Sequence, residues 1–346
     1  MMWRQTSMNS GKRINKILAM LLLFGTLYTF VFLSSNKPRT TGNEPTNFCS
    51  TPSPLLTGST NVNFEDGGGR TNWPPTFEEI NQENLHLQAG GFYPGPSTCT
   101  PKATVAIIIP YRDRDVHLRF QLHYLLGILF RQQTRHVIIV AEQEGLDIFN
   151  KGQLMNTAFN YVMKELKLDV ECVFFHDVDS ISEDDRTLYE CRGKKEVVHL
   201  SHRMDKFNYR FCCGVTVGGV LGMLPTQFAK VNGFSNIYSG WGGEDDDMNA
   251  RLTELGGYKI YRPVDEYNRY AMVHHKRDAD NPNNDYGRRL YLKWKQRQPN
   301  DGLNSLETEV ISVVKHPTHT RLYIQTKHID VDDWLGEEQP DVINQG

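Results

Sequence analysis

The sequence predicts an α/β fold with a parallel sheet, because three short apolar strands alternate with two amphipathic helices. The three strands are expected over 104–109, 136–141 and 172–175, where β-branched and aromatic residues gather. Between them, apolar residues recur at helical spacing over 118–129 and 154–162, and Asp115 is the expected N-cap of the first helix. Ligands of such sheets bind beyond the carboxyl ends of the strands, so the segment after the third strand is a candidate site.

Length and composition suit such a fold. The 346 residues are enough for one large domain or two small ones, and 39% hydrophobic residues are ample for a packed core. The net charge of −3 gives no indication of nucleic-acid binding. The six cysteines are too few for a disulfide scaffold and too scattered for a zinc module.

The N-terminal region carries an uncharged apolar run over 17–33, with four basic residues before it. We expect a cytoplasmic tail over 1–16 and a signal-anchor transmembrane helix over 17–33, with the rest of the chain in the lumen. The alternative is a cleaved signal peptide, but the run is longer than a usual apolar region of that kind and no A-x-A site follows it. A lumenal location permits disulfides.

A change of composition divides the lumenal part. Residues 34–72 are rich in Pro, Thr, Ser, Asn and Gly, and are expected to form a stem with little structure of its own. Residues 73–346 are then expected to form the folded domain.

Asp177, Val178 and Asp179 follow the third predicted strand directly. Two carboxylates one residue apart suit a hard divalent cation that also holds a diphosphate. A helix N-terminus with spare acids explains the same pattern, because D-x-D often occurs by chance. The position at a strand end favours the metal.

Residues 240–247 read G-W-G-G-E-D-D-D and are more specific. Four consecutive acids repel one another unless they have a use, and a tryptophan among glycines offers a flat face to a sugar ring on a mobile backbone. An acidic turn that opens a helix explains the charges through the helix dipole. It does not explain Trp241.

Met272 and His275 follow in the segment M-V-H-H. Histidine is a common metal ligand, whereas methionine is soft and weak, and chemistry alone would not select it. Packing in the core is the alternative for both residues.

Together these motifs resemble the β-1,4-galactosyltransferases, from about Cys49 to the C-terminal region. Other matching segments, in chain order, are 53–56, 105–114, 149–150, 204–207, 218–220 and 301–306. The resemblance implies a single GT-A domain with a Rossmann-like nucleotide-sugar site, and inverting transfer that depends on Mn²⁺.

The resemblance also implies a role for each matching residue. The implied metal ligands are Asp179, Met272 and His275. The implied UDP pocket is formed by Pro110, Tyr111, Arg112, Arg114, Phe149, Val178 and Asp179. The implied donor-sugar contacts are Asp177, Lys206, Trp241 and Glu244. The implied acceptor contacts are Trp241, Gly243, Glu244, Asp245, Asp246 and Tyr286, and Asp245 matches the general base. The implied disulfides are Cys49 with Cys99 and Cys172 with Cys191, whereas Cys212 and Cys213 have no counterpart.

Two positions depart from the family pattern. Asp113 replaces an asparagine beside the UDP pocket. Thr216 stands where galactose-using relatives have a tyrosine, which restricts the space for an N-acetyl group on C2 of the donor sugar. The smaller Thr216 therefore favours GalNAc.

The expected protein is a type II Golgi membrane enzyme. It moves galactose or GalNAc from its UDP donor to the 4-OH of terminal GlcNAc on glycoproteins or glycolipids. One alternative is a polypeptide N-acetylgalactosaminyltransferase, but those enzymes use D-x-H and retain configuration. Another is a catalytically inactive, lectin-like protein on the same fold. The sequence leaves the natural acceptor and the oligomeric state open.

Overall fold

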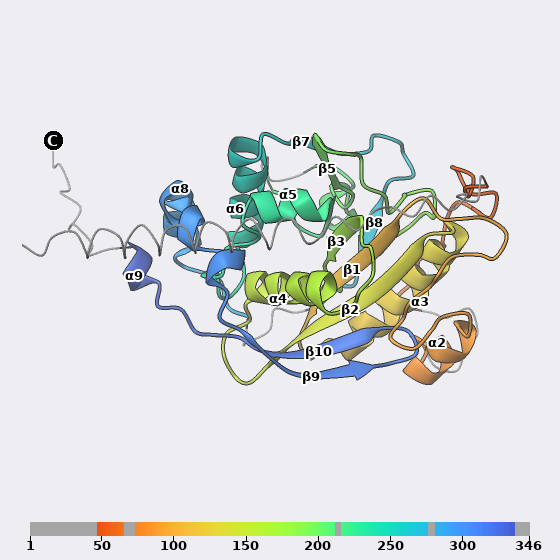
Figure 1. The fold of residues 1–346 in the computed structure, drawn as a ribbon, viewed down its shortest axis with the longest axis horizontal. Helices are drawn as coiled ribbons and strands as arrows, with labels where there is room; N and C mark the ends of the chain where they lie inside the picture. Colours follow the sequence, from red (N-terminus) through yellow and green to blue (C-terminus); the bar gives the residue numbers. More distant parts are fainter. Residues whose placement is uncertain (1–46, 66–72, 212–215, 276–280, 336–346) are drawn as a thin grey trace, which may run out of the picture. The chain divides into compact units, whose positions relative to one another are not determined.

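The computed structural model describes residues 47–65, 73–211, 216–275 and 281–335. Its main sheet has eight strands in the order β7-β5-β6-β3-β1-β2-β10-β9 (Figure 1). The strands of this sheet are β1 Thr104–Tyr111, β2 Arg135–Glu144, β3 Cys172–His176, β5 Glu196–His199, β6 Val220–Met223, β7 Lys259–Tyr261, β9 Glu309–Lys315 and β10 Thr320–Gln325. A second sheet pairs β4, Ser180–Ser182, with β8, Tyr270–Met272.

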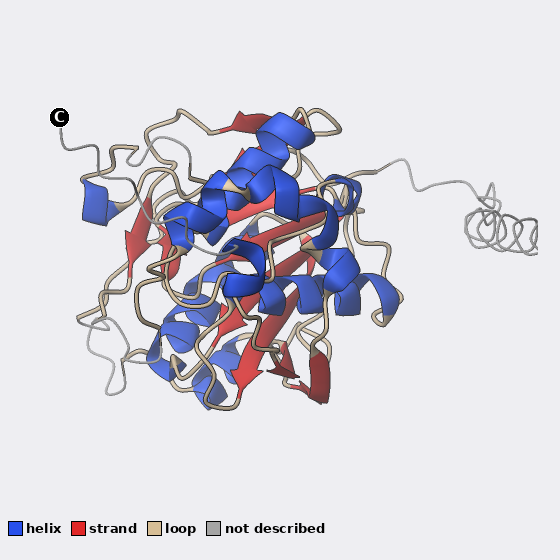
Figure 2. Cartoon of the chain, turned by 90° about the vertical axis from the view of Figure 1, so that its left-hand side faces the viewer, coloured by secondary structure: helices blue, strands red, loops and turns tan. Residues whose placement is uncertain are grey.

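The α-helices of the described residues lie among and around these strands. They are α2 Phe77–Glu83, α3 Asp115–Arg131, α4 Lys151–Lys164, α5 Pro225–Lys230, α6 Glu244–Ala250, α7 Gly287–Leu292, α8 Trp294–Arg297 and α9 Asp332–Leu335. A turn of 3-10 helix, η1, spans Asp205–Phe207. Figure 2 shows helices on both sides of the strands.

The expected α/β class is confirmed, and the three predicted strands and two predicted helices are β1, β2, β3, α3 and α4. The strands β1, β2 and β3 are parallel as expected. The sheet as a whole is mixed, because β6 pairs antiparallel with β3 and β5, and β9 pairs antiparallel with β10.

The predicted N-cap of α3 is wrong. Arg114 is the N-cap, no side chain caps the helix, and Asp115 is its first residue. The carboxylate of Asp115 instead forms an ion pair with Arg119 one turn later, at 3.0 Å. An acid in the first turn still favours the helix dipole, which explains why the sequence pattern resembled a cap.

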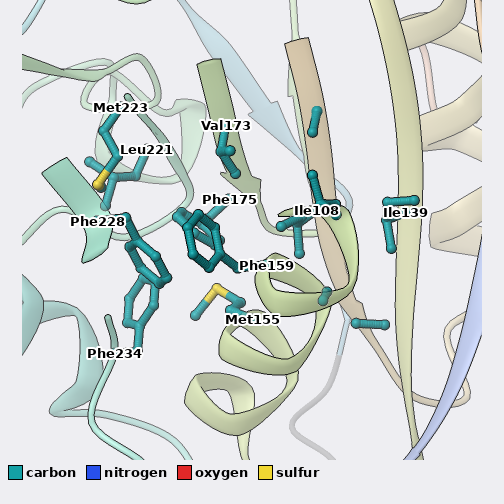
Figure 3. Packing of buried hydrophobic residues seen from close by; sticks show 14 of the residues in the cluster. Ile108, Ile139, Met155, Phe159, Val173, Phe175, Leu221, Met223, Phe228 and Phe234 are labelled. Atoms are coloured by element: carbon teal, nitrogen blue, oxygen red, sulfur yellow. The ribbon is translucent and has the colours of Figure 1, made fainter. Parts of the chain in front are cut away.

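The core lies on both faces of the sheet, because successive residues of β1 are buried on alternate sides. Ile108 belongs to a cluster on the α4 side, and Ile107 belongs to a cluster with the leucines of α3. On the α4 side, the rings of Phe175 and Phe228 pack at a tilt of 36° with their centroids 4.5 Å apart (Figure 3). Each fully buried side chain of this size stabilises the fold by roughly 1.5–3 kcal/mol, so the sheet is a rigid support for the loops at its edge.

The described part of the expected stem contacts the domain. Asp185 accepts hydrogen bonds from the backbone N–H groups of Thr57 and Gly58, both at 2.9 Å, and the N–H of Thr60 donates to Glu183 O at 2.8 Å. Residues 47–65 therefore pack against the domain ahead of residue 73, where the domain was expected to begin.

The expected tail and anchor, residues 1–33, lie outside the described residues. In the part that the structure describes, no helix is long and apolar enough to cross a membrane. Cys212 and Cys213 are also outside it.

Both expected disulfides are present. Cys49 is bonded to Cys99, and Cys172 is bonded to Cys191. The second bond joins the first residue of β3 to the loop before β5, so it holds together the two segments on either side of the D-V-D motif.

Candidate active site

The D-V-D motif lies at the carboxyl end of β3, where the parallel strands end. The N–H of Asp177 donates to Gly219 O at 2.8 Å, which joins the motif to the start of β6. Asp179 then precedes β4, whose first residue, Ser180, pairs with Met272 on β8. The N–H of Val273 donates to Asp179 O at 2.9 Å. The pairing of β4 with β8 therefore brings the expected metal ligands together, although about ninety residues separate them in the chain.

The side chains of two expected ligands meet directly. His275 Nε2 lies 3.4 Å from Asp179 Oδ2, and the His117 ring packs edge-on against the His275 ring with centroids 5.2 Å apart. Burial raises the pKa of Asp179, but the hydrogen bond from His275 and the charge of Lys206 outweigh it, and the pKa lies below its ordinary value.

The donor set suits a divalent cation. Carboxylate and imidazole are ligands that Mn²⁺ accepts, and the thioether of Met272 would be a weak addition. Within the described ranges, no three His, Cys, Asp or Glu side chains gather as a metal-binding group. The expected set contains only two of these residue types, so its third ligand would have to be the methionine.

Lys151 joins three site carboxylates and was missed from the sequence. Its Nζ lies 3.0 Å from Asp177 Oδ1, 3.2 Å from Asp245 Oδ1 and 3.4 Å from Glu244 Oε1. Lys151 is the first residue of α4, directly after the matched pair 149–150. Its position next to this matched pair is the sequence signal from which Lys151 could have been predicted as a site residue.

The charged groups in this cluster shift one another's pKa values. Burial raises the pKa of Asp245 to about 6, and Lys151 opposes this while Glu244 adds to it. Burial likewise raises the pKa of Asp177 to about 6 against the effect of Lys151. Burial alone would lower the pKa of Lys151, but the three carboxylates hold it well above its ordinary value. The lysine therefore stays charged and stabilises the ionised acids.

The four acids of the glycine-rich segment form the first turn of α6. The alternative of an acidic turn that opens a helix therefore describes the backbone here, and the acids also have individual contacts. Glu244 is buried, and its Oε2 has no hydrogen-bond partner among the described residues. Asp247 points into the core, away from the other three. One buried oxygen of Glu244 is therefore available to a hydroxyl group of a ligand.

A buried ionic network anchors α6 to the core through Asp247. Asp247 Oδ1 pairs with Arg251 at 2.5 Å, and Asp247 Oδ2 pairs with Arg297 at 2.6 Å. Asp301 contacts both arginines. Because all four side chains are almost fully buried, this network fixes the direction in which α6 presents its first turn.

The loop before α6 needs its glycines. Gly240, Gly242 and Gly243 have φ values of 84°, 107° and 101°, in the region that side chains disfavour. Trp241 between them is 60% exposed and its N–H donates to Pro282 O at 2.7 Å. The tryptophan therefore stands on the surface beside the site.

Tyr286 lies next to this loop. The N–H of Asn284 donates to Trp241 O at 3.0 Å, and a Cβ on Gly287 would lie 3.2 Å from Gly242 O. Tyr286 precedes Gly287 and is 42% exposed. The structure thus brings the two expected aromatic residues of the acceptor site to neighbouring backbone segments.

The expected UDP-pocket residues lie at or after the carboxyl ends of β1, β2 and β3. Arg112 lies 5.4 Å from the centroid of the Phe149 ring, and its Nη1 donates to Asp147 O at 2.6 Å. Tyr111, at the end of β1, lies beside Arg321, and burial raises its pKa. The remaining residues of the set are Pro110 in β1, Arg114 before α3 and Val178 against the α3-side core.

The departure at Asp113 has a backbone explanation. Its φ is 49°, in the left-handed region that Asp and Asn adopt more readily than other side chains. An acid can therefore replace the family's amide without strain.

Thr216 lies beside the acids of α6. Its side chain forms a hydrogen bond with Asp246, and its Oγ1 accepts from Gly218 N at 3.3 Å. Gly218 in turn packs against Asp245, since a Cβ added to it would lie 2.3 Å from Asp245 Oδ2.

Two family models match the chain. Residues 49–192 match the family model described as the N-terminal region of glycosyl transferase group 7, and residues 198–276 match the model described as the N-terminal domain of galactosyltransferase.

Two curated relatives are similar over most of the chain. The chain is 40% identical to human β-1,4-galactosyltransferase 2 over 251 residues, which cover 72% of the chain and 66% of that protein. It is 40% identical to β-1,4-galactosyltransferase 2 of Cricetulus griseus over 257 residues, which cover 72% of the chain and 67% of that protein. The chain thus spans about two thirds of the length of these relatives.

A solved structure has the same arrangement. It is a mutant of Drosophila β-1,4-galactosyltransferase 7 in complex with manganese, UDP-Gal and xylobiose, with a TM-score of 0.55 and 26% identity. The match covers 67% of the chain and 97% of that structure. The mixed α/β sheet is therefore that of a known glycosyltransferase.

Proposed function

The chain belongs to the β-1,4-galactosyltransferase family, and from this premise we propose that it transfers galactose from UDP-Gal to the 4-OH of a terminal GlcNAc with inversion. The observation that carries this proposal is the cluster in which Lys151 holds Asp177, Glu244 and Asp245 at the edge of the sheet. It lies beside the pair of Asp179 and His275, so base and metal ligands share one region.

Asp245 is the proposed general base. Its raised pKa of about 6 suits proton transfer near neutral pH. It takes the proton from the acceptor hydroxyl as the oxygen attacks the anomeric carbon, and a single in-line displacement inverts that carbon. Glu244, with its unpartnered buried oxygen, accepts from a sugar hydroxyl and orients the ring.

Asp179, His275 and Met272 are the proposed Mn²⁺ ligands. A divalent cation bound there supplies positive charge to the diphosphate as UDP leaves. Lys206 adds positive charge to this site, since its charge lowers the pKa of Asp179. Arg112 and Phe149, in contact with each other, are proposed to hold the nucleotide with Pro110, Tyr111, Arg114 and Val178.

Trp241 and Tyr286 are the proposed sugar platforms. Closure of the loop over 240–243, permitted by its three glycines, would cover the donor and keep water from hydrolysing it. The side chain of Asp246 and the backbone of Gly243 complete the proposed acceptor contacts.

Thr216 favours UDP-GalNAc as a second donor. Its side chain is smaller than that of tyrosine and would restrict an N-acetyl group on C2 of the donor sugar less. The comparisons support galactose and give no specific support to GalNAc, to a polypeptide N-acetylgalactosaminyltransferase or to an inactive lectin-like protein.

We place the enzyme in the Golgi membrane, with a GT-A catalytic domain in the lumen behind the anchor over 17–33. The two disulfides support a lumenal location, because they form in oxidising compartments.

A donor screen tests the proposal. The chain is incubated with Mn²⁺, a GlcNAc-terminated acceptor, and UDP-Gal, UDP-GalNAc, UDP-GlcNAc or UDP-Glc in turn. We expect transfer from UDP-Gal that stops when the metal is chelated. Absence of product with all four donors would overturn the proposal and favour the lectin-like alternative.

A further inference from the structure

The segment over 216–219, which leads into β6, contacts both the backbone of the D-V-D motif and the acidic side chains of α6. Its last carbonyl accepts from Asp177 N at 2.8 Å, and its first side chain bonds to Asp246. In the middle, Gly218 leaves no room for a Cβ beside Asp245. The position of this segment therefore decides where the proposed base can lie.

Two side chains hold the segment from the side away from the acids. Arg262, just after β7, donates from Nη2 to Thr216 O at 3.1 Å and from Nε to His199 Nδ1 at 3.1 Å. His199, the last residue of β5, contacts Gly218 O through Nε2 at 2.9 Å. The guanidinium of Arg262 therefore bonds directly to Thr216 and is linked to Gly218 through the imidazole of His199.

The chemistry fixes the roles of these atoms. A guanidinium can only donate, so His199 Nδ1 must accept and Nε2 carries the proton that goes to Gly218 O. Burial and the charge of Arg262 lower the pKa of His199 to about 3, so the ring stays neutral. Arginine makes these bonds from two nitrogens, Nε and Nη2, held in one rigid plane, a geometry that the compact ammonium of lysine does not reproduce. Arg262 also stacks on Phe211, at 4.4 Å from the ring centroid.

We propose that Arg262, acting through His199, is a positioning residue that sets the gap between Asp245 and C2 of the donor sugar. It thereby determines both turnover and the choice between UDP-Gal and UDP-GalNAc. The inference rests on the proposed function, in which Asp245 is the base and Thr216 lies beside the donor. Neither Arg262 nor His199 contacts the acids itself, so both act through the backbone of 216–218.

The test compares Arg262→Lys with Arg192→Lys in the full chain. Arg192 is the matched control, because it stacks on Tyr261, the residue before Arg262, and pairs with Glu196 instead of the 216–218 segment. We measure kcat and KM for UDP-Gal and UDP-GalNAc, and the affinity for UDP with Mn²⁺. We expect Arg262→Lys to lower kcat between about 10- and 100-fold, as small misplacements of reacting groups do. We expect the donor ratio, which is kcat/KM for UDP-Gal divided by kcat/KM for UDP-GalNAc, to change in Arg262→Lys. The affinity for UDP should stay equal to that of the Arg192→Lys control.

His199 supplies a second, independent pair. Glutamine can donate to Gly218 O and accept from Arg262, whereas phenylalanine fills the space and makes neither bond. We expect His199→Gln to keep the wild-type donor ratio and His199→Phe to change it in the same direction as Arg262→Lys. A ratio does not depend on the fraction of folded enzyme, so partial unfolding leaves this readout intact.

The inference is overturned if Arg262→Lys and His199→Phe both keep the wild-type donor ratio and the kcat of the Arg192 control. A wild-type chain that transfers neither sugar overturns the proposed function instead, and this outcome is visible before any variant is made.

Discussion

Lys151 Nζ lies 3.2 Å from both carboxylate oxygens of Asp245, so the proposed base shares a half-buried cation with the D-V-D motif. The lysine favours ionisation of a carboxylate that burial would otherwise keep protonated. This pairing of α4 with α6 is the centre of the proposed mechanism.

Replacing Asp245 with asparagine removes the proposed base and keeps the shape of the side chain. We expect kcat to fall between about 100- and 10,000-fold, the usual contribution of a positioned base. UDP affinity in the presence of Mn²⁺ should stay unchanged, as measured by calorimetry. Asp330→Asn, in the loop before α9, is the control. An Asp245→Asn variant with normal kcat would remove Asp245 from the chemistry.

Activity should depend on pH through Asp245. Its pKa is raised to about 6, so the base is protonated below that pH, and kcat/KM should fall as the pH drops through about 6. Lys151→Met removes the cation that favours ionisation. The acid limb of the pH profile should then move to higher pH. A shift to lower pH would contradict the role given to Lys151.

Replacing His275 tests the metal site. We expect His275→Ala to raise the Mn²⁺ concentration needed for half-maximal activity by at least about tenfold, since even indirect partners of metal ligands cost that much. The exposed neighbour His274 offers a matched control in His274→Ala. Equal Mn²⁺ requirements in the two variants would exclude His275 as a ligand.

Thr216→Tyr tests the choice of donor. The larger side chain should restrict the space for an N-acetyl group and shift use from UDP-GalNAc toward UDP-Gal, measured as the ratio of kcat/KM. Thr216→Ser keeps the hydroxyl group that bonds to Asp246 and should keep the wild-type ratio. An unchanged ratio in Thr216→Tyr would count against a role for this position.

The buried network behind α6 should matter for stability. Arg297→Met leaves Asp247 and Asp301 with Arg251 as the one remaining buried cation of the network, and breaking a buried ion pair costs about 3–5 kcal/mol of unfolding free energy. Lys295→Met is the control, since its ion pair with Glu254 is exposed and worth about 1 kcal/mol or less. Urea denaturation measures both. Equal losses would show that the network contributes little.

Local patterns predicted the sheet edge well. Buried strands are continuous apolar runs, so β1, β2 and β3 could be recognised and the D-V-D motif placed at the end of β3. Both disulfides followed from the family resemblance.

Features that depend on tertiary contacts could not be predicted in this way. Lys151 looks like any lysine at a helix start until α4 and α6 come together. Arg297 and Asp247 meet across fifty residues of sequence. The antiparallel strands on both sides of the parallel core were likewise absent from the prediction, because their pairing is set by partners far along the chain.

The most direct test of the account is the linkage of the product formed from UDP-Gal and a GlcNAc acceptor in the presence of Mn²⁺, determined by NMR. We predict a β-linked galactose on O4 with the wild-type chain and almost none with Asp245→Asn. An α-linked product, or equal yields from the two proteins, would contradict a single displacement driven by the carboxylate beside Lys151.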